Sequence, residues 1–103
     1  MPIKYLYLTT TGRITGKPRE IEIWFVEHGG KFYILAEHLD DTQWVKNIKH
    51  DGRVRVRLGD RTFEAIARVL DYNRDRNVWL TAQALAREKY DWGDGLPVEL
   101  TPK

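Results

Sequence analysis

Strict alternation of polar and apolar residues constrains the fold of this chain more than any other feature of its sequence. Arginine and apolar residues alternate without exception from Arg53 to Leu58, and Gly59 and Asp60 follow as a turn. The segment from Glu20 to Val26 begins with the same alternation. Because successive side chains of a strand point to opposite faces, this pattern is typical of strands that have one buried face.

Other segments have the composition of strands, because they are rich in aromatic and β-branched residues. They are Tyr5 to Thr10, Lys31 to Ala36, Arg61 to Leu70 and Leu96 to Leu100. The glycines of His28-Gly29-Gly30-Lys31 predict a tight hairpin between the second and third strands.

Two segments have the apolar spacing of helices. The short one spans Gln43 to Ile48 after Asp41 and Thr42, which we expect to cap it. The longer one begins near Asn73 or Asp75 and ends near Tyr90. The predicted order is three strands, a short helix, two strands, a longer helix and a last strand. Many short antiparallel strands in a mainly β (α+β) chain favour a closed or split barrel, since closure removes strand edges.

The composition sets limits on the function. The 103 residues, without repeat or linker, predict one domain over residues 1–103. The net charge is only +2, so a polyanionic partner is not required. Cysteine and serine are absent from the sequence, which excludes disulfides, thiolate metal sites and nucleophilic catalysis by either residue. No apolar run is long enough to cross a bilayer, and we expect a cytoplasmic protein without membrane partners.

The segment from Thr9 to Arg19 is the richest local signal for binding. It follows a predicted strand and contains three cations, two glycines and several hydroxyl groups. Arginine forks, a lysine and backbone amides freed by glycine suit a phosphate or carboxylate. The spacing is not that of a P-loop. An exposed hairpin turn is the alternative.

Arg53, Arg55 and Arg57 fall on one side of their predicted strand. Such a stripe, with aromatic residues elsewhere, is one way to bind single-stranded nucleic acid. We favour a solvated face, or a face paired with Glu20 and Glu22 of a neighbouring strand. Nucleic acid is therefore not expected as a partner.

The histidines and tryptophans give a further candidate site. His38 follows Glu37 at the end of an apolar strand, which is a common place for a binding residue. No histidine pair has metal-ligand spacing, so no metal is expected. Trp44 lies on the short helix just after this strand, where its ring could form the wall of a groove for a planar heterocycle. Packing in the core or at a subunit interface is the alternative for the tryptophans.

Several stretches together resemble a known family. They are LTTTGRITGKPREIEIWFVEHGGKFYILAEH, QWVKNI, RVRVRLGDRTFEAIARVL and GLPVELTP. They are similar to the deazaflavin-dependent nitroreductase family of the split-barrel flavin-binding superfamily, over nearly the whole chain. The resemblance implies a six-stranded antiparallel split β-barrel that forms a homodimer. It also implies coenzyme F-420, a deazaflavin with a phosphate and an oligoglutamate tail, with FMN as the alternative cofactor.

The resemblance also implies roles for individual residues. Those expected to bind the cofactor are Arg13, Lys17, Arg19, Trp24, Glu37, His38, Trp44 and Asn47. Arg13 and Arg19 match cations that hold the anionic tail, and Trp44 and Asn47 match a W-x-x-N helix beneath the ring. Tyr90 and His38 are the candidate catalytic proton donors.

One loop departs from the family pattern. Acidic groups at Glu37, Asp40 and Asp41 replace a glycine-rich loop, and they would repel a phosphate. The leading hypothesis is an oxidoreductase that transfers a hydride from reduced coenzyme F-420 to a planar nitro, quinone or enone substrate. A non-catalytic protein of the same fold that binds a planar ligand is the alternative.

Overall fold

The computed structural model describes residues 4–103, apart from the side chain of Asp40. In chain order, the elements are β1 (Tyr5–Thr11), β2 (Pro18–Trp24), β3 (Val26–His28), β4 (Lys31–Ala36), the short 3-10 helix η1 (Leu39–Asp41), α1 (Gln43–His50), β5 (Arg53–Leu58), β6 (Arg61–Val69), α2 (Arg76–Tyr90) and β7 (Leu96–Pro102). Apart from the predicted strand from Glu20 to Val26, the predicted strands and both predicted helices are confirmed, with shifts of a few residues at their ends. None of the helices in the described residues is long and apolar enough to cross a membrane.

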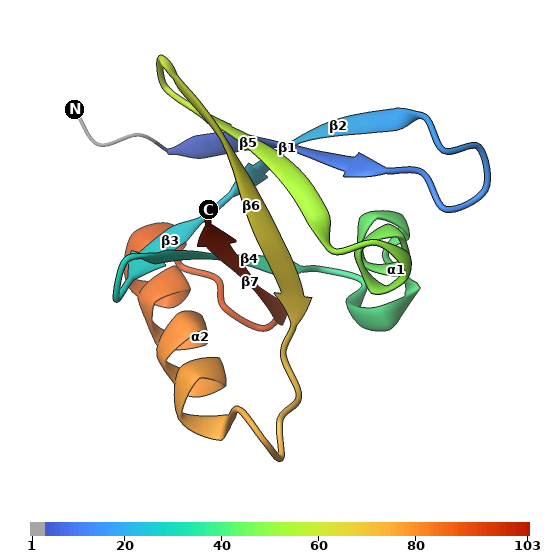
Figure 1. Cartoon of the computed structure of the whole chain (residues 1–103). Helices are drawn as coiled ribbons and strands as arrows, with labels where there is room; N and C mark the ends of the chain where they lie inside the picture. Colours follow the sequence, from blue (N-terminus) through green and yellow to red (C-terminus); the bar gives the residue numbers. More distant parts are fainter. Residues whose placement is uncertain (1–3) are drawn as a thin grey trace.

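The strands form a single antiparallel sheet that is curled into an open half-barrel (Figure 1). Its order is β2-β1-β5-β6-β7-β4-β3, with seven strands. The mainly β class is therefore confirmed, whereas the expected six-stranded barrel is wrong. The additional strand arises because the expected strand from Glu20 to Val26 is two strands, β2 and β3.

Phe25 is the point at which that strand divides. Trp24 pairs with Tyr5 of β1, whereas Val26 pairs with Tyr33 of β4 at the opposite edge of the sheet. The two edge strands are thus consecutive in the chain, which holds the sheet in its curl. Alternation in the sequence gave no sign of the break, because the residues around it are all apolar.

The interruption at Phe25 removes its backbone groups from the strand ladder, and α2 supplies their partners. The Phe25 N–H donates to the Tyr90 hydroxyl at 3.1 Å, and that hydroxyl lies 2.8 Å from the Phe25 carbonyl. Lys89 Nζ also donates to the Phe25 carbonyl, at 3.0 Å. Buried backbone groups must be paired, so the C-terminal turn of α2 stabilises the break.

Two clusters of apolar residues stabilise the fold. The main one fills the inside of the half-barrel and is formed by the inward positions of the strands with Val45 and Ile48 of α1. The second lies between the sheet and α2, where Tyr33 and Leu35 of β4 pack against Ala82 and Ala86. In Figure 1, α1 and α2 accordingly occupy different sides of the sheet.

A polar network centred on the buried Glu99 connects β4, β6 and β7. Glu99 is only 6% exposed and accepts a hydrogen bond from the Tyr33 hydroxyl at 3.0 Å. Arg68 and Lys31 approach the same carboxylate at 3.3 and 3.7 Å, and Arg68 also pairs with Asp75 at 3.0 Å. Burial, reinforced by the bond to the Glu99 carboxylate, raises the pKa of Tyr33 to about 12.

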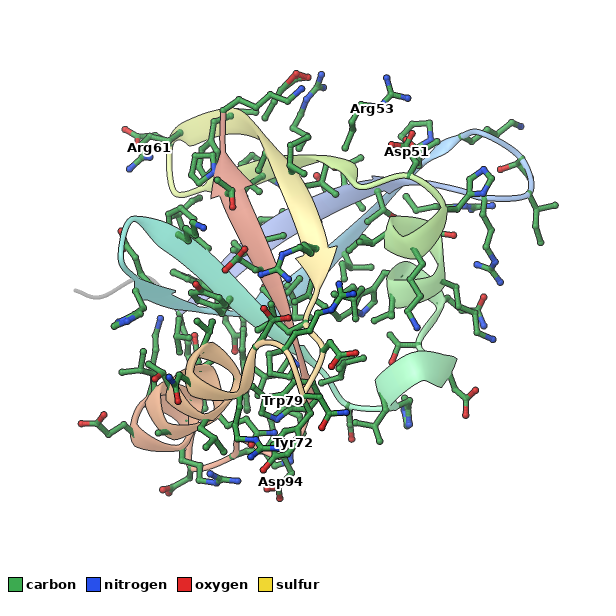
Figure 2. All side chains as sticks on the ribbon, turned by 60° about the horizontal axis from the view of Figure 1, so that its bottom comes forward. Asp51, Arg53, Arg61, Tyr72, Trp79 and Asp94 are labelled. Atoms are coloured by element: carbon green, nitrogen blue, oxygen red, sulfur yellow. The ribbon has the colours of Figure 1, made fainter. Side chains whose placement is uncertain are left out.

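The arginine stripe of β5 lies on the exposed face of the sheet, as its alternation predicts. Arg53 pairs with Asp51 at 2.9 Å (Figure 2), and its hydrogen bonds lower the pKa of Asp51 to about 2. Arg57 lies 4.0 Å from the ring centre of Tyr7 and 3.7 Å from the Glu20 carboxylate. In the sheet, β1 lies between β5 and β2. The pair between Arg57 of β5 and Glu20 of β2 therefore reaches across β1.

Candidate functional site

An open groove of about 710 Å³ runs along β2, between α1 and the end of α2. Its walls are mainly apolar and aromatic, and they include Ile21, Ile23, Trp24, Trp44, Tyr90 and Trp92. This volume and this lining are typical of sites for small planar molecules. Isoleucines 21 and 23 contribute because alternation along β2 turns both of them to the inner side of the sheet.

Trp24 and Tyr90 form the end of the groove nearest α2. Their rings are stacked, with centres 4.5 Å apart and planes inclined by 3°. The Tyr90 hydroxyl lies 2.6 Å from the Lys4 carbonyl in addition to its contacts with Phe25. The hydroxyl therefore connects two segments of backbone, at Lys4 and at Phe25, and holds the Tyr90 ring in place.

The mouth of the groove carries two polar side chains that follow β4. Glu37 and His38 both line it and are exposed. Within the part of the chain whose side chains are described, neither side chain has a hydrogen-bond or ionic partner. Leu39 next to them takes a φ of 54°, a left-handed conformation that costs a residue with a Cβ about 1 kcal/mol. This sharp turn takes the chain away from β4 into η1.

Thr42 is the one residue with a buried, unpartnered side-chain oxygen among those described. It precedes α1 and lines the groove, but its hydroxyl does not cap the helix. Leaving a buried hydroxyl without a partner costs about 1–3 kcal/mol. Such a group suggests a role in binding.

Trp92 lies against the end of β4 because Gly95 leaves space for its ring. A Cβ at Gly95 would be 2.8 Å from Trp92 Cη2 and 2.9 Å from the Ala36 carbonyl oxygen. Both distances are shorter than real contacts allow. Glycine is therefore required here for the indole to close this side of the groove.

Arg13 connects the loop between β1 and β2 to α1. Its guanidinium donates to Asn47 Oδ1 at 2.9 Å and to Gln43 Oε1 at 2.8 Å. Asn47, which is 6% exposed, donates in turn to Thr10 Oγ1 at 3.2 Å. Because the partners of Arg13 are neutral amides, its positive charge is not compensated by a carboxylate.

Lys17 and Arg19 add two further cations to this hairpin. Arg19 shares a face of β2 with Ile21, and its Nε lies within 3.7 Å of the position that a Cβ on Gly12 would occupy. Neither Lys17 nor Arg19 has a carboxylate partner among the described side chains. Three cations without carboxylate partners form a surface suited to an anion.

The structure brings together most of the predicted site residues. Trp24, Glu37, His38, Trp44 and Tyr90 line one groove, and Arg13 contacts Asn47 directly. Lys17 and Arg19 lie on the adjacent hairpin and are not part of the lining. The expected acidic side chain of Asp40 lies outside the described part of the structure. The roles assigned to these residues remain predictions.

Sequence reasoning missed Thr42, Tyr5 and Trp92, which also line the groove. Trp92 follows the end of α2 and precedes two glycines. That pattern is the sequence signal that could have identified Trp92 as a residue of the groove. Among the described residues, no three or more histidine, aspartate or glutamate side chains form a cluster that could hold a metal.

Solved structures with the same fold include several proteins of known or suggested activity. A protein described as an F-420-H2-dependent reductase, FDR-A, is 28% identical, with a TM-score of 0.72 over 97% of this chain and 94% of that chain. The heme storage protein HutZ of Vibrio cholerae is 21% identical, with a TM-score of 0.77 over 97% of this chain and 82% of that one. A protein described as a domain-swapped dimer is 26% identical, with a TM-score of 0.68 over 100% of this chain and 82% of that one.

These similarities place the chain in a class of proteins of one fold that includes an F-420-H2-dependent reductase. The family profile for F420H(2)-dependent quinone reductase matches residues 1–98. The chain belongs to that family.

Proposed function

We propose that this protein is a deazaflavin-dependent oxidoreductase that transfers a hydride from reduced coenzyme F-420 to a planar acceptor. Quinones are the first acceptors to test, because the family is named for them. Nitro and enone compounds are further candidates with the same electrophilic character. The observation that carries the proposal is the aromatic groove beside a cationic hairpin, in a chain that belongs to this family.

The residues present fit the cofactor on three counts. Trp44 and Ile21 provide apolar walls for a flat ring system. Thr42 offers an unpartnered hydroxyl, which is the kind of group that the polar edge of a deazaflavin needs. Arg13 and Arg19, with Lys17, would hold the phosphate and the glutamate tail by charge-assisted bonds.

Coenzyme F-420, when bound, supplies the hydride, and the protein supplies position and environment. The walls of the groove would orient an acceptor against the ring, which lowers the entropic part of the barrier. Trp24, stacked on Tyr90, and Trp92 would exclude water from that space. Arg13 is held by two amides of α1, so it is already in place before the anionic tail arrives.

Reduction of a quinone also requires a proton, and His38 has the better geometry of the two predicted donors. Its imidazole is at the mouth of the groove and free of partners among the described side chains. The Tyr90 hydroxyl lies within 2.8 Å of two carbonyl oxygens, which compete for its hydrogen. We therefore propose His38 as the proton donor, with Tyr90 holding the backbone at Phe25.

The activity is tested by mixing the protein with reduced coenzyme F-420 and 2-methyl-1,4-naphthoquinone and following the absorbance of the oxidised cofactor. We expect turnover that depends on the protein, and a lower kcat for His38→Gln with a changed pH profile. Absence of turnover with quinone, nitroaromatic and enone acceptors would contradict the proposal. Turnover with reduced FMN but not with reduced coenzyme F-420 would identify FMN as the cofactor of the same groove.

A non-catalytic binding protein is the second candidate. Glu37 at the mouth of the groove supports it, because a carboxylate disfavours an approaching anionic cofactor. The similarity to a structure described as a domain-swapped dimer supports a homodimer in either case. Tight binding of a flavin-like or other planar ligand, without turnover of quinone or nitroaromatic acceptors, would favour this candidate.

A further inference from the structure

One corner of the groove combines a carboxylate with aromatic rings. Glu37 follows Ala36, the last residue of β4, and lies at the mouth. The ring of Trp92 packs against the same end of β4, since its Cη2 and the Ala36 carbonyl oxygen both lie within 3 Å of the Cβ position of Gly95. Glu37 and Trp92 therefore both line the groove near the end of β4.

No lysine or arginine is among the described residues that line the groove. Two glutamates do line it, Glu22 and Glu37. The Glu22 carboxylate lies 3.5 Å from the Tyr7 hydroxyl, which donates to it. Of these two glutamates, Glu37 is the one whose carboxylate has no hydrogen-bond or ionic partner among the described side chains.

The cations near the groove are engaged elsewhere or lie toward its other end. Lys89 Nζ, from α2, donates to the Phe25 carbonyl and lies 3.8 Å from the centre of the Phe25 ring. Arg13, Lys17 and Arg19 belong to the β1–β2 hairpin, on the side of α1. The groove is therefore positive beside α1 and negative at the mouth formed by the end of β4.

We infer that the groove selects planar acceptors that carry a positive charge, with Glu37 as the residue that determines this specificity. The inference rests on the proposed reductase function for its catalytic part. An alkylammonium group at the mouth would lie close to the Glu37 carboxylate and to aromatic ring faces, and both attract cations. An anionic substituent in the same place would meet the carboxylate without a cation to compensate it.

Two matched acceptors test the inference. One is a 1,4-naphthoquinone with a propyl-trimethylammonium substituent, and the other has a propyl-sulfonate at the same position. Their dissociation constants for the purified protein without added cofactor are measured at low salt by quenching of tryptophan fluorescence. We expect the cationic quinone to bind about fivefold more tightly, from one exposed ion pair and one cation–π contact.

The variant Glu37→Gln keeps the size of the side chain and removes its charge. We expect its preference for the cationic quinone to fall to about twofold, which is the part that the cation–π contact supplies. Glu88→Gln is the matched control, because Glu88 is exposed on α2 and does not line the groove. It should keep the full preference. Salt should reduce the preference of the wild-type protein, since exposed charges are screened.

Equal affinities for the two quinones, or a preference that Glu37→Gln leaves unchanged, would overturn the inference. The ratio of kcat/KM for the same pair, measured with reduced coenzyme F-420, should follow the ratio of affinities. If the affinity ratio holds but neither quinone is reduced, the inference stands and the reductase function fails. If both quinones are reduced and bound equally well, the function stands and the charge preference is wrong.

Discussion

Replacement of Tyr90 by phenylalanine separates the structural and catalytic roles of this residue. The change removes a hydroxyl that accepts a hydrogen bond from the Phe25 N–H at 3.1 Å and lies 2.6 Å from the Lys4 carbonyl. The phenyl ring can still stack on Trp24. The variant therefore tests the hydrogen bonds at the break between β2 and β3 and little else.

The expected loss of stability follows from the group that is left without a partner. The Phe25 carbonyl keeps its bond from Lys89, but the Phe25 N–H loses its acceptor, and Phe25 is only 6% exposed. An unsatisfied buried donor costs about 1–3 kcal/mol. We expect Tyr90→Phe to lower the free energy of unfolding by about 2 kcal/mol, which corresponds to a fall in Tm of roughly 10 °C for a domain of this size.

Urea unfolding followed by tryptophan fluorescence measures the free energy, with Tyr72→Phe as the control. The Tyr72 ring meets the Trp79 ring edge-on at 5.5 Å (Figure 2), and its hydroxyl has no partner among the described residues. The control should therefore change stability by less than about 0.5 kcal/mol.

Quinone reduction by the same variant should fall by less than about tenfold, because His38 is the proposed proton donor. A variant of unchanged stability that loses a hundredfold or more in kcat would refute this reasoning. It would assign Tyr90 the catalytic role that its sequence position suggested.

Three further predictions concern the hairpin, the polar network around Glu99 and the aromatic wall. Arg13→Ala and Arg19→Ala should each weaken binding of coenzyme F-420 at least about tenfold by fluorescence titration, while Arg55→Ala on the exposed face of β5 should not. In the folded state the pKa of Tyr33 is raised to about 12 from its ordinary value of 10.0. The stabilisation that this shift adds to the free energy of unfolding is therefore complete below pH 10 and is lost as the pH rises toward 12. The free energy of unfolding should therefore decline by about 2 kcal/mol more in the wild type than in Tyr33→Phe between these pH values, and parallel declines would contradict the shift. Gly95→Ala should lower the free energy of unfolding by about 1–3 kcal/mol in the same urea assay, because its Cβ meets the Ala36 carbonyl, and an unchanged midpoint would show that the wall can move.

Much of the fold could be predicted from local pattern. Alternation from Arg53 to Leu58 identified β5, and the glycine pair at Gly29 and Gly30 identified the hairpin before β4, where both take positive φ. These signals are local, because turn geometry and the burial of one face depend on neighbouring residues. The number of strands could not be predicted, because the division at Phe25 depends on partners from α2, 64 and 65 residues away.

The candidate site was predicted in part for the same reason. The resemblance placed Trp44 and Asn47 correctly on one short helix, and the contact between Arg13 and Asn47 joins two predicted residues. Trp92 was missed because its position in the groove depends on the space above Gly95, which only the packed structure reveals. Likewise, the orphaned hydroxyl of Thr42 is a property of burial and not of sequence.

The binding of coenzyme F-420 tests the central claim most directly. Purified protein is titrated separately with coenzyme F-420 and with FMN, and quenching of tryptophan fluorescence is followed, since Trp24, Trp44 and Trp92 all line the groove. The structure and the family predict micromolar or tighter binding of coenzyme F-420, weakened in Arg19→Ala. A wild-type protein whose fluorescence responds to neither molecule would contradict the account.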